Sequence, residues 1–275
     1  MDQEVNNIDT EVVPFLKWAG GKRWFAQDFS DIFPSDFNTY FEPFLGSGAV
    51  FFHLNPSKSV LSDLNEELIN SYIQVRDNWE RIEKDLKSYH RKHSKEFYYE
   101  TRSYKPRISM NRAVRFIYLN RTCWNGLYRV NLKGEFNVPV GSKKNVVLDT
   151  DNFYDLSKRL KKSTLIVCDF ERTIDKSESG DFIFIDPPYT VKHNMNGFVK
   201  YNEKIFTWDD QVRLKNAIER ASLRGVKFLL TNAYHESIRD LYHGLGEFLE
   251  VERASVISGK ATARGRYSEL IIRNY

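Results

Sequence analysis

Apolar residues along this chain follow two patterns. Short apolar runs bounded by glycine, proline or polar residues predict buried strands, and longer stretches with apolar residues three or four positions apart predict helices. Strands are predicted for the segments TYFEPF, KSVLS, TLIVC, FIFID, VKFLLT, FLEVE and SELIIR. Helices are predicted for AVFFHL, from the end of KSVLS to about Trp79, from about residue 150 to Lys162, and from about Trp208. Strands that alternate with helices indicate an α/β fold with a largely parallel sheet.

The middle of the chain differs from this α/β pattern. Residues 67–123 are rich in Arg, Lys, Tyr and Glu at helical spacing, with a break at Pro106, and RAVRFIYLNR predicts a helix with one buried face. LYRVNLKGEFNVPVG predicts a β-hairpin around Lys133-Gly134. We therefore predict an α/β domain, residues 1–66 and 145–275, interrupted by a module over residues 67–144. Residues 1–13 are expected to form a loose tail.

Composition excludes several classes of protein. Hydrophobic residues make up 41% and charged residues 28% of the chain, which is ordinary for a globular protein. The longest apolar runs fall well short of the roughly 18 residues of a membrane span, and the acidic start MDQEVNNIDTEVVP lacks the features of a secretory signal. Cys123 and Cys168 are too few for a disulfide framework or a cysteine zinc site. We expect a soluble intracellular protein without a metal.

Charge separates the middle module from the rest of the chain. Residues 67–144 hold 17 basic and 8 acidic residues, a net charge of +9, whereas the remaining residues carry a net charge of −5. A basic module between mildly acidic segments favours contact with a polyanion. A solvated basic helical face explains the charge equally well.

The sharpest chemical motif is Asp186-Pro187-Pro188-Tyr189, which follows the apolar run FIFI. Two prolines cannot continue the ladder of a strand, so the acid and the aromatic ring are expected at its carboxyl end, where open α/β sheets bind ligands. A carboxylate and a proline carbonyl both accept hydrogen bonds from an exocyclic amine of a nucleobase, and a tyrosine ring can stack on the base. We favour this interpretation over a polar turn after a core strand.

Two further segments suit a cofactor. Gly46 and Gly48 in FEPFLGSG allow close backbone approach to a ligand, and Asp63 ends the next strand, where α/β cofactor domains hold a ribose diol. Because the full GxGxxG is absent, an adenosine-containing cofactor without a pyrophosphate fits better than a dinucleotide. KWAGGK, at residues 17–22, is not a P-loop, since Arg23 stands where a hydroxyl residue is needed. It offers a flat ring, flexible backbone and a cation for a carboxylate; the alternative is a basic surface turn.

These motifs in this order resemble the Dam-type adenine-N6 DNA methyltransferases, from about Pro14 to the end of the chain. The cofactor motifs come first, the recognition region lies in the middle, and the catalytic motif comes late, in the alpha arrangement. The resemblance implies a Rossmann-like S-adenosylmethionine-dependent methyltransferase domain with an inserted helical and β-hairpin target-recognition module. It also implies S-adenosylmethionine as cofactor, double-stranded DNA as partner, flipping of the target adenine, and a cytoplasmic location in a bacterial or phage-infected cell.

The same resemblance assigns roles to individual residues. Lys22 would lie near the cofactor carboxylate, Asp63 would take the ribose hydroxyls, and Asp169 with Phe170 would contact the cofactor's adenine ring. Asp186 and the Pro187 carbonyl would hold the target N6 amine, and Tyr189 would stack on the flipped base. The cofactor-binding set is Trp18, Lys22, Phe44, Gly46, Gly48, Asp63, Asp169, Phe170 and Asp186, and the catalytic set is Asp186, Pro187, Pro188 and Tyr189.

The hairpin resembles the one with which Dam-type enzymes recognise GATC. By that resemblance Arg129 reads a guanine, with the bidentate pairing that arginine geometry favours. Leu127 and Pro139 would touch the neighbouring base pairs, and Trp124 with Asn125 would fill the space left by the flipped adenine. The family commonly has a smaller aromatic residue where Trp124 stands. The alternative for this stretch is a stabilising hairpin with incidental charge.

Three functions remain open from the sequence. The first is a site-specific adenine-N6 DNA methyltransferase, either solitary, encoded by a phage, or paired with a cognate restriction endonuclease. The second is a methyltransferase with another acceptor, RNA adenine or cytosine N4, and the third is a catalytically silent DNA-binding relative. The basic segments 190–206 and 258–267 are expected to be loops on the DNA side, with Lys192 and Lys200 as candidate phosphate contacts.

Overall fold

The structure, a computed structural model, describes residues 12–131, 133–192, 206–254 and 266–275. These residues fall into two compact units, each assembled from three segments of the chain. Unit 1 combines the chain up to Asp28, Gly46–Asn55 and Glu66–Lys162, and unit 2 combines Phe29–Leu45, Pro56–Asn65 and the chain from Ser163. Most of the predicted loops at 190–206 and 258–267, including Lys200, and most of the predicted N-terminal tail lie outside the described residues.

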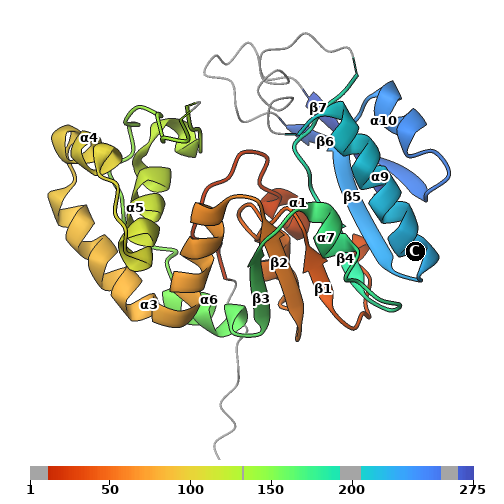
Figure 1. The fold of residues 1–275 in the computed structure, drawn as a ribbon, viewed down its shortest axis with the longest axis horizontal. Coiled ribbons are helices and arrows are strands. Elements are labelled where there is room, and N and C mark those ends of the chain that lie inside the picture. Colours follow the sequence, from red (N-terminus) through yellow and green to blue (C-terminus); the bar gives the residue numbers. More distant parts are fainter. Residues whose placement is uncertain (1–11, 132, 193–205, 255–265) are drawn as a thin grey trace, which may run out of the picture. The chain divides into compact units, whose positions relative to one another are not determined.

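Unit 2 contains a seven-stranded sheet with the order β3-β2-β1-β4-β5-β7-β6 (Figure 1). Its strands are β1 Tyr40–Glu42, β2 Ser59–Asp63, β3 Ser163–Val167, β4 Phe182–Ile185, β5 Lys227–Ala233, β6 Glu247–Ala254 and β7 Arg266–Arg273. The first five strands pair in parallel, and β7 runs antiparallel to both β5 and β6. Every predicted strand is present, and the expectation of a mixed α/β, Rossmann-like sheet is confirmed.

Three helices supply the apolar residues that cover one face of this sheet: α7 Phe170–Ile174, α9 Trp208–Leu223 and α10 Glu236–Leu241. Thr207 and Asp210 form a reciprocal capping box at the start of α9, which explains why the helix begins there. Alternate strand residues point into the resulting core, as expected for a period of two. The buried cluster includes Phe41 of β1, Ile183 and Ile185 of β4, Phe228 and Leu230 of β5, and Leu270 and Ile272 of β7.

The other face of the sheet in unit 2 is lined by aromatic rings. Phe33 packs on Phe182 and Phe184 with ring centroids 6.5 and 6.3 Å apart, and Tyr275 packs edge-on against Phe182 at 6.0 Å. Strand β4 is therefore buried on both faces, and all four of its residues are buried. This burial explains why its sequence, FIFI, is a continuous apolar run and not an alternating one.

Unit 1 is helical among the described residues. It contains α1 Arg23–Asp28, α2 Ala49–Leu54, α3 Glu66–Lys92, α4 Lys95–Ser103, α5 Ser109–Thr122, the 3-10 turn η2 Trp124–Gly126 and α6 Phe153–Leu160. Helix α3 packs against α5 and α6, and α4 packs against α5. Pro106 lies between α4 and α5, as predicted, and α3 continues well beyond the predicted end at Trp79, with a break in helical geometry at Asn78.

The predicted hairpin consists of two isolated antiparallel bridges, Cys123 to Val140 and Val130 to Phe136. Asn131 closes its turn, because its side-chain Oδ1 accepts from the backbone of both Lys133 and Glu135 at 2.9 Å. The hairpin and Gly46–Asn55 both belong to unit 1. We predicted a division by function, with residues 1–66 and 145–275 catalytic and residues 67–144 for target recognition. This division stays a prediction.

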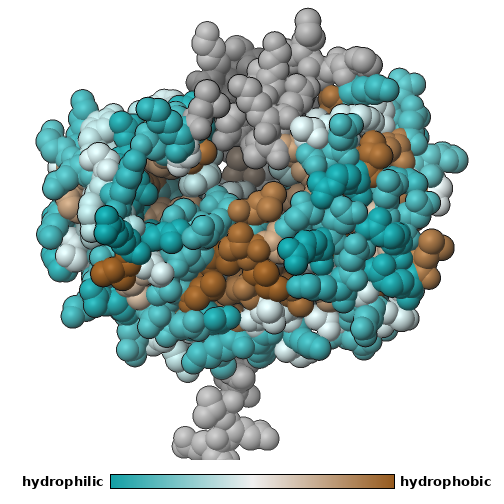
Figure 2. Space-filling view, in the orientation of Figure 1, coloured by the Kyte–Doolittle hydropathy of each residue, from teal (hydrophilic) through white to brown (hydrophobic). Residues whose placement is uncertain are grey.

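The surface in the orientation of Figure 1 is mostly hydrophilic, with an apolar area over the edge strand β3 (Figure 2). Val167 at the end of β3 is 47% exposed, and Leu64 directly after β2 is 65% exposed. None of the helices among the described residues has the length and apolar character of a membrane span.

Candidate functional site

The predicted site residues of unit 2 follow the ends of neighbouring parallel strands. Phe44 follows β1, Asp63 ends β2, Asp169 follows β3 and Asp186 follows β4. The strand order reverses direction between β1 and β4, and ligands of open α/β sheets bind outside the carboxyl ends of the strands at such a switch point. Unit 2 therefore brings these residues to one edge of the sheet, as expected.

Asp186 is held by the neighbouring strand. The Thr231 hydroxyl of β5 donates a hydrogen bond of 2.7 Å to Asp186 Oδ1. The register of β4 and β5 explains this contact, because Ile185 pairs with Leu230 and the next residues along both strands come side by side. Thr231 is fully buried, whereas Asp186 is only partly buried. The carboxylate thus lies at the boundary between the core of unit 2 and its surface.

Tyr189 is anchored by a second strand residue. Its phenol donates to Glu269 Oε2 of β7 at 2.9 Å, and Glu269 is only 8% exposed. Burial, followed by the nearby carboxylates of Asp186 and Glu269, raises the pKa of Tyr189 well above its ordinary value. The phenol therefore stays protonated and remains a donor at neutral pH. Asp186, Tyr189 and their two partners form one connected polar group.

The predicted cofactor residues of unit 2 make local contacts of their own. Asp63 Oδ1 accepts from the backbone of Asn65 at 2.9 Å. Asp169 caps α7 and forms an ion pair of 2.9 Å with Arg213 of α9. The Phe170 ring is 3% exposed and stacks on Phe44 at 5.3 Å between centroids, with the Arg213 guanidinium 4.9 Å from its ring. Phe44, Asp169 and Phe170 therefore form one cluster.

Unit 1 brings together the two glycine motifs. A Cβ atom on Gly46 would lie 2.8 Å from Trp18 Cδ1, closer than real contacts allow, and Gly46 has φ of +47°. Gly46 is thus required both by its left-handed backbone and by the Trp18 ring against it. Gly48, with φ of +63°, precedes α2. Lys22 is 2% exposed, and its Nζ donates to the Gly20 carbonyl at 2.9 Å.

The predicted DNA-reading residues form an exposed group on unit 1. Trp124, Asn125, Leu127, Arg129 and Pro139 are all exposed. The Trp124 backbone donates to the Pro139 carbonyl at 2.9 Å, and Arg129 Nε donates to Asn137 Oδ1 at 2.9 Å. Asn125 has φ of +54°, a conformation that asparagine tolerates better than most residues. We name these five residues the recognition loop.

Sequence reasoning missed several residues that support these motifs. The Asn120 side chain bonds both backbone groups of Lys17, accepting from its nitrogen at 2.9 Å and donating to its carbonyl at 2.7 Å. Arg121, 2% exposed, binds Asp151 through two nitrogens and donates to the Phe15 and Val146 carbonyls. The end of α5 therefore fixes the KWAGGK segment. The signal for this role is a polar Asn-Arg pair inside an otherwise apolar helix face.

An aromatic stack joins KWAGGK to the recognition loop within unit 1. The Trp18 and Tyr128 rings lie 5.7 Å apart at an interplanar angle of 19°. Tyr128 lies between Leu127 and Arg129 in the sequence. A Cβ atom on Gly126 would lie 2.9 Å from Lys17 Cβ, so the Gly126 backbone lies close against the Lys17 side chain.

Comparison with known proteins identifies the family. Residues 18–257 match the family described as D12 class N6 adenine-specific DNA methyltransferase. The chain belongs to this family. The match contains the recognition loop, the DPPY motif and all of KWAGGK apart from its first residue, Lys17.

Several curated relatives of the methyltransferase cover nearly its whole length. It is 36% identical to the type II methyltransferase M1.LlaDCHI of Lactococcus lactis subsp. cremoris, over 95% of each chain. It is 36% identical to the type II methyltransferase M.MjaIII of Methanocaldococcus jannaschii, over 96% of this chain and 100% of the relative. The DNA adenine methylase of Haemophilus influenzae is 31% identical, over 94% of this chain and 92% of the relative. The protein is therefore an adenine-specific DNA methyltransferase, with relatives of the type II class.

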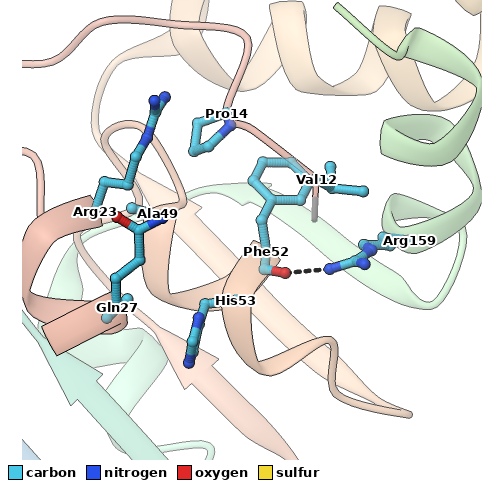
Figure 3. A pocket seen from close by; sticks show the side chains of 9 residues that line it. Val12, Pro14, Arg23, Gln27, Ala49, Phe52, His53 and Arg159 are labelled. Atoms are coloured by element: carbon cyan, nitrogen blue, oxygen red, sulfur yellow. Dashed lines mark hydrogen bonds between the residues drawn. The ribbon is translucent and has the colours of Figure 1, made fainter. Parts of the chain in front are cut away.

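The methyltransferase also has a pocket of about 190 Å³ in unit 1 (Figure 3). It is lined by Val12, Pro14, Arg23, Ala26, Gln27, Ala49, Phe52, His53 and Arg159. Arg159 of α6 donates to the Phe52 carbonyl at the end of this pocket. None of the lining residues is among the predicted site residues, although Arg23 and Ala49 directly follow Lys22 and Gly48.

Proposed function

We propose that the protein transfers a methyl group from S-adenosylmethionine to N6 of adenine in duplex DNA, in the sequence GATC, after flipping the target base. The observation that carries this proposal is the end of β4, where the Asp186 carboxylate and the Tyr189 ring are held side by side by partners on β5 and β7. An acceptor amine needs such a carboxylate, and a flipped base needs such a ring.

The donor set of each unit fits S-adenosylmethionine. In unit 1, Gly46 leaves space that a Cβ atom would fill beside Trp18, and Lys22 offers a buried cation for a carboxylate. In unit 2, Asp63 ends β2, where a ribose diol is commonly held, and the Phe44–Phe170 stack offers apolar rings. We propose that Trp18, Lys22, Phe44, Gly46, Gly48, Asp63, Asp169, Phe170 and Asp186 contact the cofactor.

The residues at the end of β4 would act on the acceptor. S-adenosylmethionine, when bound, supplies an electrophilic methyl group on a positive sulfur that becomes a neutral thioether. We propose that Asp186 and the Pro187 carbonyl accept hydrogen bonds from the N6 amine, which makes its lone pair available for the new N–C bond. The amine then loses one of these two protons, which passes to water. Pro188 ends the strand, and Tyr189 stacks on the base, so catalysis rests on orientation and electrostatic support.

We propose that the recognition loop reads the DNA sequence. Exposed Trp124 and Asn125 are suited to occupy the space of the flipped base, and Leu127 and Pro139 to contact neighbouring base pairs. Arg129 would pair with guanine O6 and N7. On this proposal residues 67–144 are the target-recognition module, and residues 1–66 and 145–275 are catalytic. The type II relatives favour a cognate restriction endonuclease as a functional partner.

The test of the proposed function is methyl transfer from labelled S-adenosylmethionine to a GATC duplex, a scrambled duplex and RNA. We expect label on N6 of adenine in the GATC duplex alone. Label on the scrambled duplex at the same rate would refute the GATC assignment, and label on RNA or cytosine N4 would refute the acceptor.

The Asp186→Ala substitution tests the acceptor site. We expect single-turnover methylation to be lost, because the carboxylate acts on the acceptor amine, while the DNA dissociation constant stays close to that of the wild type. Near-normal methylation by this variant would remove Asp186 from the mechanism.

A further inference from the structure

Two strand residues outside the DPPY motif make hydrogen bonds to side chains within it, and Thr231 contacts the side chains of both Asp186 and Tyr189. Thr231 of β5 donates to Asp186 Oδ1 at 2.7 Å, and Glu269 of β7 accepts from the Tyr189 phenol at 2.9 Å. Both come from the half of the sheet where β7 is inserted between β5 and β6. They therefore connect the motif to strands β5 and β7.

Thr231 is suited to orient a carboxylate. It is fully buried, and its backbone is fixed between β4 and β7 by the strand registers. A β-branched side chain has few rotamers, so its hydroxyl points in one direction. Because the hydroxyl binds Oδ1, it fixes the rotation of the carboxylate about its terminal torsion. The second oxygen, Oδ2, is then presented in a defined direction.

Glu269 is suited to orient an aromatic ring. Its backbone pairs with Ala233 on one side and Val251 on the other, and its side chain is 8% exposed. A carboxylate that is buried needs a donor, and the raised pKa of the Tyr189 phenol keeps that donor protonated. A tyrosine ring held at its hydroxyl end can still offer its face to a base. The bond therefore limits how the ring tilts without covering it.

We propose that Thr231 and Glu269 are positioning residues for adenine methylation, Thr231 directing Asp186 Oδ2 to the acceptor amine and Glu269 setting the tilt of the Tyr189 ring. This inference rests on the acceptor roles proposed above for Asp186 and Tyr189. Neither residue touches the base. Both act through the group that does, so their loss lowers the rate of the chemical step and leaves binding of DNA and cofactor unchanged.

The first test compares Thr231→Ser with Thr231→Ala. Both variants lose the same methyl group, and only Thr231→Ala loses the hydroxyl, so any effect of reduced packing is common to the two. We expect the single-turnover rate to fall about 10- to 100-fold in Thr231→Ala, the range for a hydrogen bond to a charged group, and to be restored by Thr231→Ser. Equal rates in the two variants would overturn the role of Thr231.

The second test is a double-mutant cycle between Glu269→Ala and Tyr189→Phe, with Glu269→Gln as the conservative variant. If Glu269 acts through the phenol, the Glu269→Ala substitution has no further effect on the single-turnover rate of a protein that already carries Tyr189→Phe. The double-mutant cycle is then strongly non-additive. Glu269→Gln keeps an acceptor and retains most of the rate. Fully additive losses would overturn the role of Glu269.

A spectroscopic measurement separates positioning from a general loss of structure. With 2-aminopurine in place of the target adenine, the fluorescence of the bound duplex reports stacking on the Tyr189 ring. We expect Glu269→Ala to change this signal more than Thr231→Ala does, because Glu269 accepts the phenol hydrogen bond and Thr231 acts mainly on Asp186. The same change in both variants would overturn separate roles for the two residues.

Failure of this inference is distinct from failure of the proposed function. If Asp186→Ala is inactive while Thr231→Ser and Thr231→Ala are equally active, the acceptor site stands and the positioning role falls. If Asp186→Ala is fully active, the acceptor site itself falls.

Discussion

Arg129 is the side chain on which the proposed sequence specificity depends most. It is exposed, and the bond from its Nε to Asn137 uses one of the five donors of the guanidinium. We expect Arg129→Ala to cost about 1–3 kcal/mol against the cognate site and to relax selection at one base position. The measurement is the methylation rate on GATC and on each single-base variant, at two salt concentrations.

Lys133→Ala is the matched control, because Lys133 is an exposed cation in the turn of the same hairpin. It should weaken methylation of every sequence alike or have no effect. If Arg129→Ala also lowers the methylation rate on every sequence alike, Arg129 is a phosphate contact. If the variant still discriminates fully between GATC and its single-base variants, Arg129 does not read the sequence.

Lys17 makes the free energy of unfolding depend on pH in the alkaline range. Burial, followed by the neighbouring Lys143, lowers the pKa of Lys17 to about 8. An unfolded lysine keeps its proton to about pH 10.4, so this group destabilises the fold below pH 8 and the penalty disappears as pH rises from about 8 to about 10.4. We expect wild type to gain stability relative to Lys17→Gln over that window in urea unfolding. A constant difference between pH 7 and pH 10 would contradict the lowered pKa.

At the scale of elements, Gly46 decides how the turn before α2 meets the KWAGGK segment. Gly46→Ala would place a Cβ atom 2.8 Å from Trp18 Cδ1 and strain a backbone with φ of +47°. We expect the variant to bind S-adenosylmethionine roughly tenfold more weakly, a loss of about 1.4 kcal/mol, because the added Cβ atom would displace the Trp18 ring from the proposed cofactor site. Isothermal titration of the cofactor measures this loss.

Gly244→Ala controls for backbone strain, because Gly244 has φ of +83° and no heavy atom within 4 Å of its added Cβ. It should lower thermal stability and leave cofactor affinity unchanged. Equal loss of affinity in both variants would show that the Trp18 contact is not what matters.

Elements built from local patterns were predictable, and those built from distant contacts were not. FIFI and VKFLLT predicted β4 and β5 because buried strands need continuous apolar residues. The roles of Thr231 and Glu269 depend on strand order, and that order pairs residue 269 with residue 233. A single sequence carries no signal for that pairing. The predicted helix end at about Trp79 lies next to the break at Asn78, and the continuation of α3 to Lys92 was missed.

The candidate site was predictable where chemistry is concentrated in a motif. DPPY, Asp63 and the glycine turns stand out as motifs, and the structure gives each of them contacts of its own. The Asn120-Arg121 pair in an apolar helix face signals a buried polar role, but the partner of Asn120 was not predictable, because Lys17 lies 103 residues away.

At the scale of the whole molecule, charge distribution predicts how DNA affinity depends on salt. The net charge of +9 over residues 67–144 contrasts with −5 elsewhere. We expect log K for a GATC duplex to fall linearly with log salt, by about 0.9 for each phosphate neutralised, and cofactor affinity to depend far less on salt. Filter binding at several salt concentrations gives the slope. A slope near zero would exclude phosphate contacts by this segment.

The sheet order also sets a constraint on biosynthesis. Strand β7 lies between β5 and β6, although both of those strands precede it in the chain. While a ribosome is still translating residues 266–273, β5 has an open edge and β6 has no neighbour to pair with. Tyr189 also lacks its Glu269 partner until then. The nascent enzyme is therefore expected to stay inactive until β7 emerges, so the sheet and its acceptor site are completed together.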